Sequence, residues 1–175
     1  MTAAGRTVGA VDVEPGGWQV RAVSADDHDR WRVLYAAYAR SYRVAQSDEQ
    51  AERTWGWLLD PAHEVEGLVV VDEHGQVAGL AHVRPFARPL SATVGGFLDD
   101  LHVDEPARGT GAVDALLHAL QDLAADRGWS VVRWITADDN YRARGKYDRV
   151  AARTTWVTYD MPAALTPAAP VVQDT

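Results

Sequence analysis

The sequence predicts a single α/β (α+β) domain in which helices cover a mixed β-sheet. Strand and helix patterns alternate in the order β-α-α-β-β-β-α-β-α-β, which is typical of a layered sandwich. The length of 175 residues suits one domain with a real core and is short for two. Hydrophobic residues make up 47% and charged residues 24%, as in ordinary globular proteins.

The two ends of the chain lack a periodic pattern. Residues 1–17 mix Gly, Ala and Thr and end in Pro-Gly-Gly, and residues 162–175 contain three prolines and several alanines. Such segments bury too little apolar surface to become ordered, so both are expected to be flexible tails. The folded domain is therefore expected over residues 18–161.

The first part of this domain predicts one strand followed by two helices. The strand is expected at Trp18–Val23, and Ser24 can cap the next helix. Aromatic side chains recur along that helix at i, i+4, i+7 and i+11, in one stripe: Trp31, Tyr35, Tyr38 and Tyr42. A second helix is expected from about Asp48 to Leu59, because Asp60 precedes a proline and so disfavours helical backbone.

The middle of the domain predicts three strands. Val65–Val71 and Gln76–Arg84 are apolar and flank Asp72-Glu73-His74-Gly75, a pattern typical of a β-hairpin. A further strand is expected at Thr93–Val103.

The last part predicts a helix, a buried strand, a short helix and a final strand. Gly128 is a suitable stop for the first of these helices, whose apolar residues fall on one face. Asp138 or Asp139 can cap the short helix. The four elements are expected at Ala112–Arg127, Val131–Thr136, about 138–148 and Thr154–Tyr159.

Composition narrows the classes of ligand. The formal net charge is -8, whereas a protein that grips phosphate backbones normally presents a basic face, so nucleic acid is not an expected partner. A negative field instead favours a cationic small molecule such as an amine. No apolar run approaches the ~20 residues of a membrane span, and the N-terminus lacks an export signal. We therefore expect no membrane association and a cytoplasmic location.

Several reaction types are excluded by missing residues. The chain contains no cysteine, which excludes disulfides, Cys-ligated metals and a Cys nucleophile. Neither a His-Glu-x-x-His motif nor a Cys/His cluster is present, so no metal is expected. The Gly-x-Ser-x-Gly elbow of serine hydrolases is also absent.

The most specific local motif is the turn Asp104-Glu105-Pro106-Ala107-Arg108-Gly109-Thr110-Gly111, between a strand and a helix. Unpaired amides at a helix start attract anions, glycines let the backbone approach a phosphate, and Arg108 adds a cationic fork. The turn is not a Walker loop, because the Gly-x-x-x-x-Gly-Lys-Ser/Thr pattern is absent, and it is not a dinucleotide fingerprint, because position 114 is Asp. A plain strand-to-helix turn that needs glycines for sharpness remains the alternative.

The pattern Arg108-x-x-Gly111-x-Gly/Ala after such a strand resembles the pyrophosphate motif of the GNAT superfamily of N-acetyltransferases. This chain departs from the pattern at Val113. The resemblance implies a mostly antiparallel mixed sheet of about six to seven strands with about four helices, and acetyl-CoA as co-substrate. It implies that the pyrophosphate is bound by Arg108, Gly109, Thr110, Gly111, Ala112 and Val113. It also implies that the pantetheine arm pairs with Leu101, His102 and Val103.

A second motif, Asn140-x-x-Ala143-x-x-x-Tyr147, follows downstream. Offsets of 0, 3 and 7 place the three side chains on one face of a helix. In the family, the Asn position contacts the pantetheine region, the small Ala makes room for CoA, and the Tyr donates a proton to the leaving thiolate. Packing of the helix against the sheet remains the alternative for Tyr147.

Acidic and aromatic residues are the candidates for the acceptor side. Strand alternation puts Asp100 and His102 on one face and Asp99 on the other. Family members carry an acid here, so Asp100 is favoured over Asp99 and His102 as the group that accepts the amine proton, with structural pairing as the alternative. The expected acceptor-binding residues are Tyr38, Tyr42, Trp55, Asp99 and Asp100, with the rest of the segment Arg53–Trp57 in the same wall. Core packing is the alternative for the aromatic stripe.

Together these features predict transfer of the acetyl group of acetyl-CoA to a primary amine of a small molecule, in a ternary complex. A non-catalytic acyl-CoA-binding or sensor module and an acyltransferase with another acyl donor remain alternatives. Many members of the resembled family are dimers, and this alone is the reason to expect a homodimer.

Overall fold

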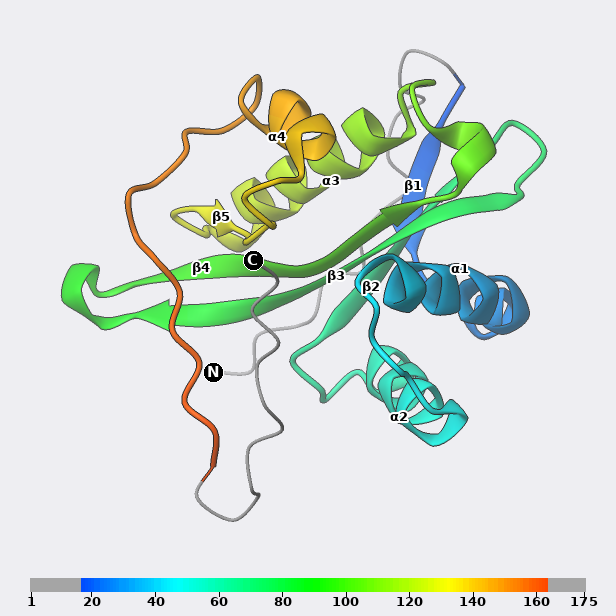
Figure 1. Ribbon diagram of the computed structural model, residues 1–175, viewed down its shortest axis with the longest axis horizontal. Helices are drawn as coiled ribbons and strands as arrows, with labels where there is room; N and C mark the ends of the chain where they lie inside the picture. Colours follow the sequence, from blue (N-terminus) through cyan, green and yellow to red (C-terminus); the bar gives the residue numbers. More distant parts are fainter. Residues whose placement is uncertain (1–16, 164–175) are drawn as a thin grey trace. The chain divides into compact units, whose positions relative to one another are not determined.

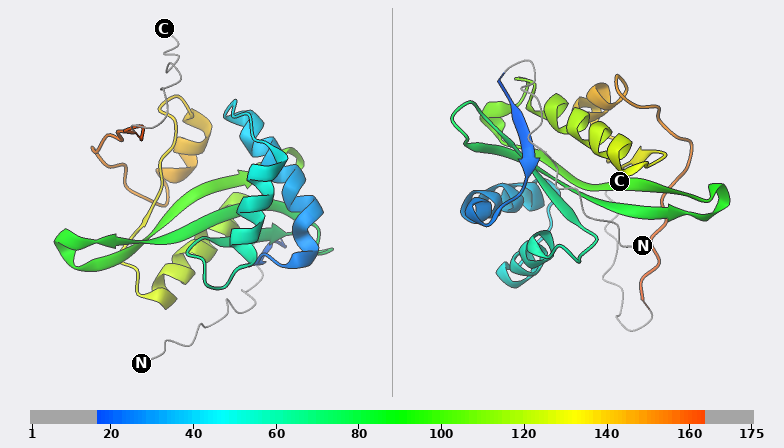
Figure 2. Two further views of the ribbon diagram at one scale, coloured as in Figure 1. Left: turned by 90° about the horizontal axis from the view of Figure 1, so that it is seen from below. Right: turned by 180° about the vertical axis from the view of Figure 1, so that it is seen from behind.

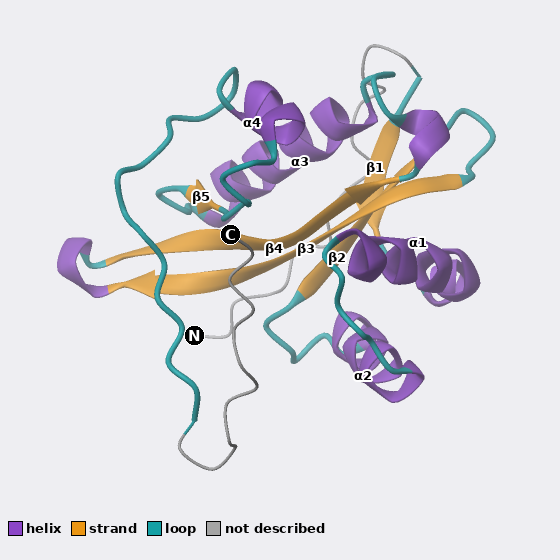
Figure 3. Cartoon of the chain, in the orientation of Figure 1, coloured by secondary structure: helices purple, strands orange, loops and turns teal. Residues whose placement is uncertain are grey.

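The computed structural model describes residues 17–163. The predicted tails, residues 1–17 and 162–175, lie outside these residues apart from Gly17, Pro162 and Ala163. The described chain forms two compact units, one ending at Ile135 and one beginning at Thr136. The first unit holds the sheet and three α-helices, and the second holds one short α-helix (Figures 1 and 3).

A five-stranded sheet forms the centre of the first unit, with its strands in chain order. The strands are β1 (Gln19–Ala22), β2 (Glu66–Val71), β3 (Val77–Arg88), β4 (Thr93–Val103) and β5 (Val132–Arg133). The first four are antiparallel and β5 is parallel to β4, which confirms the mixed, mostly antiparallel sheet. Five strands in the described chain are fewer than the roughly six to seven expected for this type of layered fold.

The prediction of a final strand at Thr154–Tyr159 is wrong, because these residues adopt no regular secondary structure. Their Thr, Trp, Val and Tyr residues favour extended backbone, but a strand is stable only when a neighbour pairs with it. Trp156 is 82% exposed and Tyr159 is 89% exposed, so the segment buries little apolar surface. The strand expected at Val131–Thr136 is also shorter than predicted and covers only β5.

Three helices cover the sheet, α1 and α2 on one face and α3 on the other (Figures 1 and 2). Their bounds are α1 (His28–Ser41), α2 (Asp48–Leu59) and α3 (Ala112–Arg127). The side chains of Ser47 and Gln50 form a reciprocal capping box that starts α2. Gly128, with φ of +65°, ends α3 as predicted.

The packing of α1 and α2 on the sheet confirms a core role for part of the aromatic stripe. Trp31 and Leu34 of α1 are each 1% exposed, and the Trp31 ring lies 4.9 Å from that of Trp55 on α2. Val69 and Leu80 complete the same cluster from the sheet. Each fully buried side chain of this size contributes roughly 1.5–3 kcal/mol to folding.

Gly79 of β3 leads to a testable prediction about stability. A Cβ at this position would lie 2.7 Å from the His102 carbonyl oxygen and 2.9 Å from Cγ2 of Val103. Because strand pairing fixes both residues, we expect Gly79→Ala to lower the free energy of unfolding by about 1–3 kcal/mol in urea denaturation. Gly56→Ala on α2 is the control, since a Cβ at this position would lie within 4 Å of no other atom. Ala also favours the helix over Gly by roughly 1 kcal/mol. Equal free energies for the two variants would contradict this account.

Candidate functional site

The loop between β4 and α3 has the geometry of an anion site. A 3₁₀-turn at Glu105–Ala107 leads into Arg108, and α3 begins at Ala112. Gly109 and Gly111 have φ of +86° and +103°, a region that other residues rarely adopt. Since the first amides of a helix have no intrahelical acceptors, they point outward at the positive end of its dipole.

Hydrogen bonds hold this loop in place. Oγ1 of Thr110 donates to the Ala107 carbonyl at 2.7 Å, and the indole Nε1 of Trp18 donates to the Thr110 carbonyl at 3.0 Å. Nε of Arg108 donates to the Val103 carbonyl at 3.2 Å. The loop is therefore fixed by the protein's own contacts, and the contribution of Trp18 is one that the local sequence motif does not indicate.

The last two positions of the motif lie in the first turn of α3. Ala112 is fully buried, and Val113 is half-buried. The Ala112 side chain is therefore enclosed in the core, while the β-branched side chain of Val113 lies partly at the surface.

The edge of β4 that faces β5 is open over its C-terminal half. In the described chain, β5 pairs with β4 only at residues 96 and 97. The Asp104 amide donates to the Ala78 carbonyl of β3 at 2.8 Å. Backbone groups alternate along a strand, so the amides of Leu101 and Val103 point to the opposite, open edge. Such an edge can pair with an extended ligand that carries amide groups.

Asn140, Ala143 and Tyr147 lie together in the second unit, which we describe by itself. The helix α4 (Tyr141–Tyr147) carries Ala143 and Tyr147 four residues apart, on the same side. Asn140 is its N-cap.

The prediction that Asp138 or Asp139 caps this helix is wrong. Oδ1 of Asn140 accepts from the Ala143 amide at 3.4 Å, and its Nδ2 donates to Oγ1 of Thr136 at 3.1 Å. The Asp138 carboxylate instead forms an ion pair of 3.0 Å with a side chain of the helix itself, Arg144.

A pocket of about 330 Å³ lies against α1, β3 and the middle of β4. Its charged lining residues are Glu64, Asp99, Asp100 and Arg84. Its ring-bearing lining residues are Tyr35, Trp57, His63 and His82. Three carboxylates with one guanidinium and several rings suit a cationic small molecule.

Asp99 and Asp100 both line this pocket, and the expectation that they face opposite sides of the sheet is wrong. His82 pairs with Asp100, whereas the next residue of β3, Val83, pairs with Leu98. Asp99 is therefore the extra residue of a β-bulge, which interrupts the alternation of side chains.

The two carboxylates have different partners. Oδ2 of Asp99 lies 3.0 Å from Nε of Arg84, and Oδ2 of Asp100 lies 2.8 Å from Nδ1 of His82. Burial raises the pKa of the Asp99 carboxyl, and the Arg84 charge opposes this shift. Asp99 thus forms an ion pair with Arg84, while Asp100 is hydrogen-bonded to the imidazole of His82.

The aromatic residues expected at the acceptor site lie in several environments. Trp55 is 8% exposed and belongs to the core, while Tyr42 is 48% exposed at the end of α1. The Tyr38 ring stacks on that of Tyr35 at 6.3 Å. Within the predicted segment Arg53–Trp57, Thr54 and Trp57 line the pocket, and Tyr35 and His63 line it although the sequence did not point to them as acceptor residues. Trp57 differs from Trp55 because positions two apart on a helix point in nearly opposite directions.

The phenols near Asp100 favour their protonated form. Burial raises the pKa of Tyr35 to about 12, and the negative charge of Asp100 adds to the effect. The same two causes raise the pKa of Tyr38. Both hydroxyls therefore remain hydrogen-bond donors near neutral pH.

His102 lies farther along β4 and is 7% exposed. Its Nε2 has no hydrogen-bond partner among residues 17–163. Burial lowers the pKa of its imidazole, and the charge of Arg108 lowers it further. His102 therefore favours the neutral form, and it is not part of the pocket lining.

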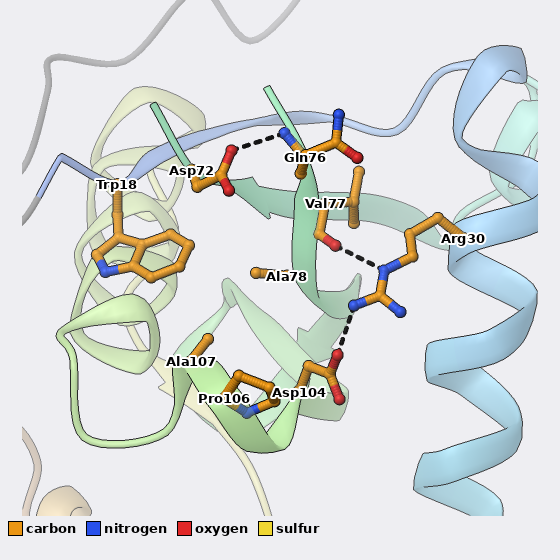
Figure 4. A pocket seen from close by; sticks show the side chains of 9 residues that line it. All are labelled: Trp18, Arg30, Asp72, Gln76, Val77, Ala78, Asp104, Pro106 and Ala107. Carbon is orange, nitrogen blue, oxygen red and sulfur yellow. Dashed lines mark hydrogen bonds and ion pairs between the residues drawn. The ribbon is translucent and has the colours of Figure 1, made fainter. Parts of the chain in front are cut away.

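A second hollow, of about 340 Å³, lies beside the start of the anion loop (Figure 4). Across it, Arg30 of α1 donates to the Val77 carbonyl at 2.9 Å and pairs with Asp104 at 2.5 Å (Figure 4). Trp18 and Pro106 line its other side. These contacts tie α1 to the end of β4, so we assign the hollow a structural role.

No group of three or more His, Cys, Asp or Glu residues within 17–163 is placed to hold a metal ion. No helix in that range has the length and apolar character needed to cross a membrane.

Comparison with known proteins gives one family. Residues 31–151 match the model of the acetyltransferase (GNAT) family. The D-amino-acid N-acetyltransferase HPA3 of Saccharomyces cerevisiae is 28% identical over 141 residues, which cover 80% of this chain and 88% of that protein. The mycothiol acetyltransferase of Clavibacter sepedonicus is 31% identical over 143 residues, which cover 79% of this chain and 44% of that longer protein.

Solved structures share the fold. The ribosomal-protein-alanine N-acetyltransferase of Brucella melitensis biovar Abortus 2308 superposes with a TM-score of 0.67 at 23% identity. The match covers 83% of this chain and 99% of that one. The fold therefore recurs at low sequence identity.

The raised pKa of Tyr35 can be tested by NMR titration of protein with ¹³C-labelled tyrosine. We expect Tyr35 to titrate at about 12 in the wild type and at lower pH in Asp100→Asn, because the variant removes a nearby negative charge. Asp99→Asn is the matched control, since the Asp99 charge is not among the causes of the shift. An unchanged pKa in Asp100→Asn would contradict a contribution from the Asp100 charge.

Proposed function

Since this chain belongs to the acetyltransferase (GNAT) family, it is an acetyl-CoA-dependent acyltransferase, and we propose that it acetylates a primary amine of a small molecule. One observation carries the proposal: Asp100 lines a pocket of about 330 Å³ that is rich in carboxylates and rings. Such a pocket has the size and charge for a small cationic acceptor. The name of the yeast relative gives D-amino acids, which are small amines, as acceptors of that protein.

Acetyl-CoA, when bound, supplies an acetyl group activated as a thioester. We assign its pyrophosphate to the amides from Arg108 to Val113, where Gly109 and Gly111 keep the backbone accessible. The open edge of β4 at Leu101 and Val103 suits its amide-bearing arm. Asn140 and Ala143 are assigned to the same arm because they match the family motif.

Proton transfers complete the proposed reaction. A bound ammonium loses two protons, the first to become the nucleophilic amine and the second as the C–N bond forms and the C–S bond breaks. Asp100, directly or through a water, accepts the first proton, the second leaves to solvent, and Tyr147 supplies the proton that the leaving sulfur gains. The chain contains no cysteine, so direct attack by the amine is simpler than transfer through an acyl-enzyme.

The donor site can be tested by calorimetric titration with acetyl-CoA and with CoA. We expect Gly111→Val to raise the Kd by about 10-fold or more, because φ of +103° is strained for Val and the loop must shift. Gly75→Val is the matched control, since Gly75 also has a positive φ, of +76°, but lies in the β2–β3 turn. Equal affinity in Gly111→Val and the control would refute the loop assignment.

Turnover can be tested with a panel of small amines, by measuring release of the CoA thiol. The chain has no cysteine, so it adds no thiol of its own to the signal. We expect Asp100→Asn and Tyr147→Phe each to lower kcat on the order of 10²-fold or more, with CoA affinity unchanged. Tyr141→Phe is the control on the same helix, with a side chain that is 75% exposed.

Other outcomes of the two experiments would select the alternatives. CoA binding without turnover of any amine would favour an acyl-CoA-binding or sensor module. Turnover only with another acyl-CoA would favour a different donor.

A further inference from the structure

Behind the acceptor pocket lies a chain of hydrogen bonds that starts in the core. Nε1 of Trp31 donates to Nε2 of His82 at 3.0 Å, and Nδ1 of His82 lies 2.8 Å from Oδ2 of Asp100. Trp31 and His82 are each 1% exposed, whereas the Asp100 side chain is 20% exposed and lines the pocket. The three residues belong to α1, β3 and β4, so the chain joins three elements.

The direction of these hydrogen bonds fixes the tautomer of His82. An indole N–H can only donate, so Nε2 of His82 must accept and carries no proton. A neutral imidazole keeps its one proton on the other nitrogen, so Nδ1 of His82 donates to the Asp100 carboxylate. A second proton on His82 would have to displace the Trp31 bond and leave a buried donor without a partner.

Aromatic packing holds the imidazole in this orientation. The Tyr35 ring lies edge-on to His82 at 5.1 Å and tilted against Trp31 at 4.8 Å. The Trp55 ring also lies tilted against Trp31, at 4.9 Å. A ring enclosed in this way cannot turn without displacing its neighbours.

Resting on the proposed function, we infer that Trp31 and His82 are positioning residues that hold the Asp100 carboxylate as an anion aimed at the acceptor amine. In a Ser-His-Asp triad the carboxylate orients the histidine that moves the proton. Here the order is reversed, since the histidine is the buried support and the carboxylate reaches the pocket. His82 donates only one hydrogen bond and brings no positive charge, so Asp100 keeps its full charge for an ammonium.

The tautomer can be measured directly by ¹⁵N NMR of the histidine rings in the wild-type protein near neutral pH. The signal of His82 is identified by its loss in His82→Asn. We expect a neutral ring with the proton on Nδ1. A proton on Nε2, or on both nitrogens, would overturn the inference without any activity measurement.

Kinetics of four variants test the positioning role. Trp31→Phe removes the indole donor, and His82→Leu removes the donor to Asp100. We expect each variant to lower kcat on the order of 10-fold or more and to change KM less than about 2-fold. The reason is that the Asp100 carboxylate loses its orientation toward the amine, while the rest of the pocket is kept. His82→Asn should recover most of the kcat, since its amide nitrogen lies near the position of Nδ1 and can donate.

The fourth variant, Leu34→Val, controls for packing. Leu34 is 1% exposed in the same cluster and has no polar side-chain atom. We expect it to lose some stability and keep the kcat and the His82 tautomer of the wild type. If Leu34→Val lowers kcat as much as Trp31→Phe, or if His82→Asn is as slow as His82→Leu, the role is structural and the inference fails.

These outcomes separate the inference from the proposed function. A wild type that turns over amines while Trp31→Phe and His82→Leu keep normal kcat would reject the positioning role alone. A wild type that turns over no amine would reject the proposed function, and the inference with it. If His82→Leu does not fold, the wild-type tautomer and Trp31→Phe still decide.

Discussion

The pairing of β3 with β4 is the constraint on which both parts of the candidate site depend. It extends from Gly79 opposite Val103 to Arg88 opposite Thr93 and changes register once, at Asp99. One edge of β4 pairs with β3, and among residues 17–163 the other edge pairs only with the short strand β5. The same pairing brings His82 against β4 and turns Asp99 into the pocket. Loss of register here would disturb donor and acceptor sides together.

Much of the fold is predictable because the burial of one face of a helix or strand requires apolar residues at regular spacing along the sequence. The bounds of α2 and α3 follow from one-sided apolar faces with clear stops, and the β2–β3 hairpin follows from its turn. The segment Thr154–Tyr159 has the same local signal and forms no strand, since pairing depends on a neighbour that local residues do not specify. The bulge at Asp99 is unpredictable for the same reason, because it is a property of two strands.

The candidate site likewise has one part that local sequence predicts and one part that depends on contacts between distant segments. The anion loop is the local part. The pocket proposed for the acceptor is lined by residues from separated segments of the chain, and packing places Tyr35 and His82 in that lining. No spacing in the sequence links His82 to its neighbours, which is why a buried polar residue of the core was missed as part of the site.

A buried imidazole is costly unless its nitrogens are paired, and here both are, by Trp31 and Asp100. Apolar side chains at positions 31 and 82 could fill the same volume with no polar atoms to satisfy. The polar pair Trp31 and His82 adds orientational specificity rather than better packing, because its hydrogen bonds require one orientation and one tautomer of the His82 ring. Both His82 and Asp100 line the pocket, and Asp100 is the more exposed of the two. The packing of the core therefore restricts the orientation of the carboxylate that the proposed chemistry uses.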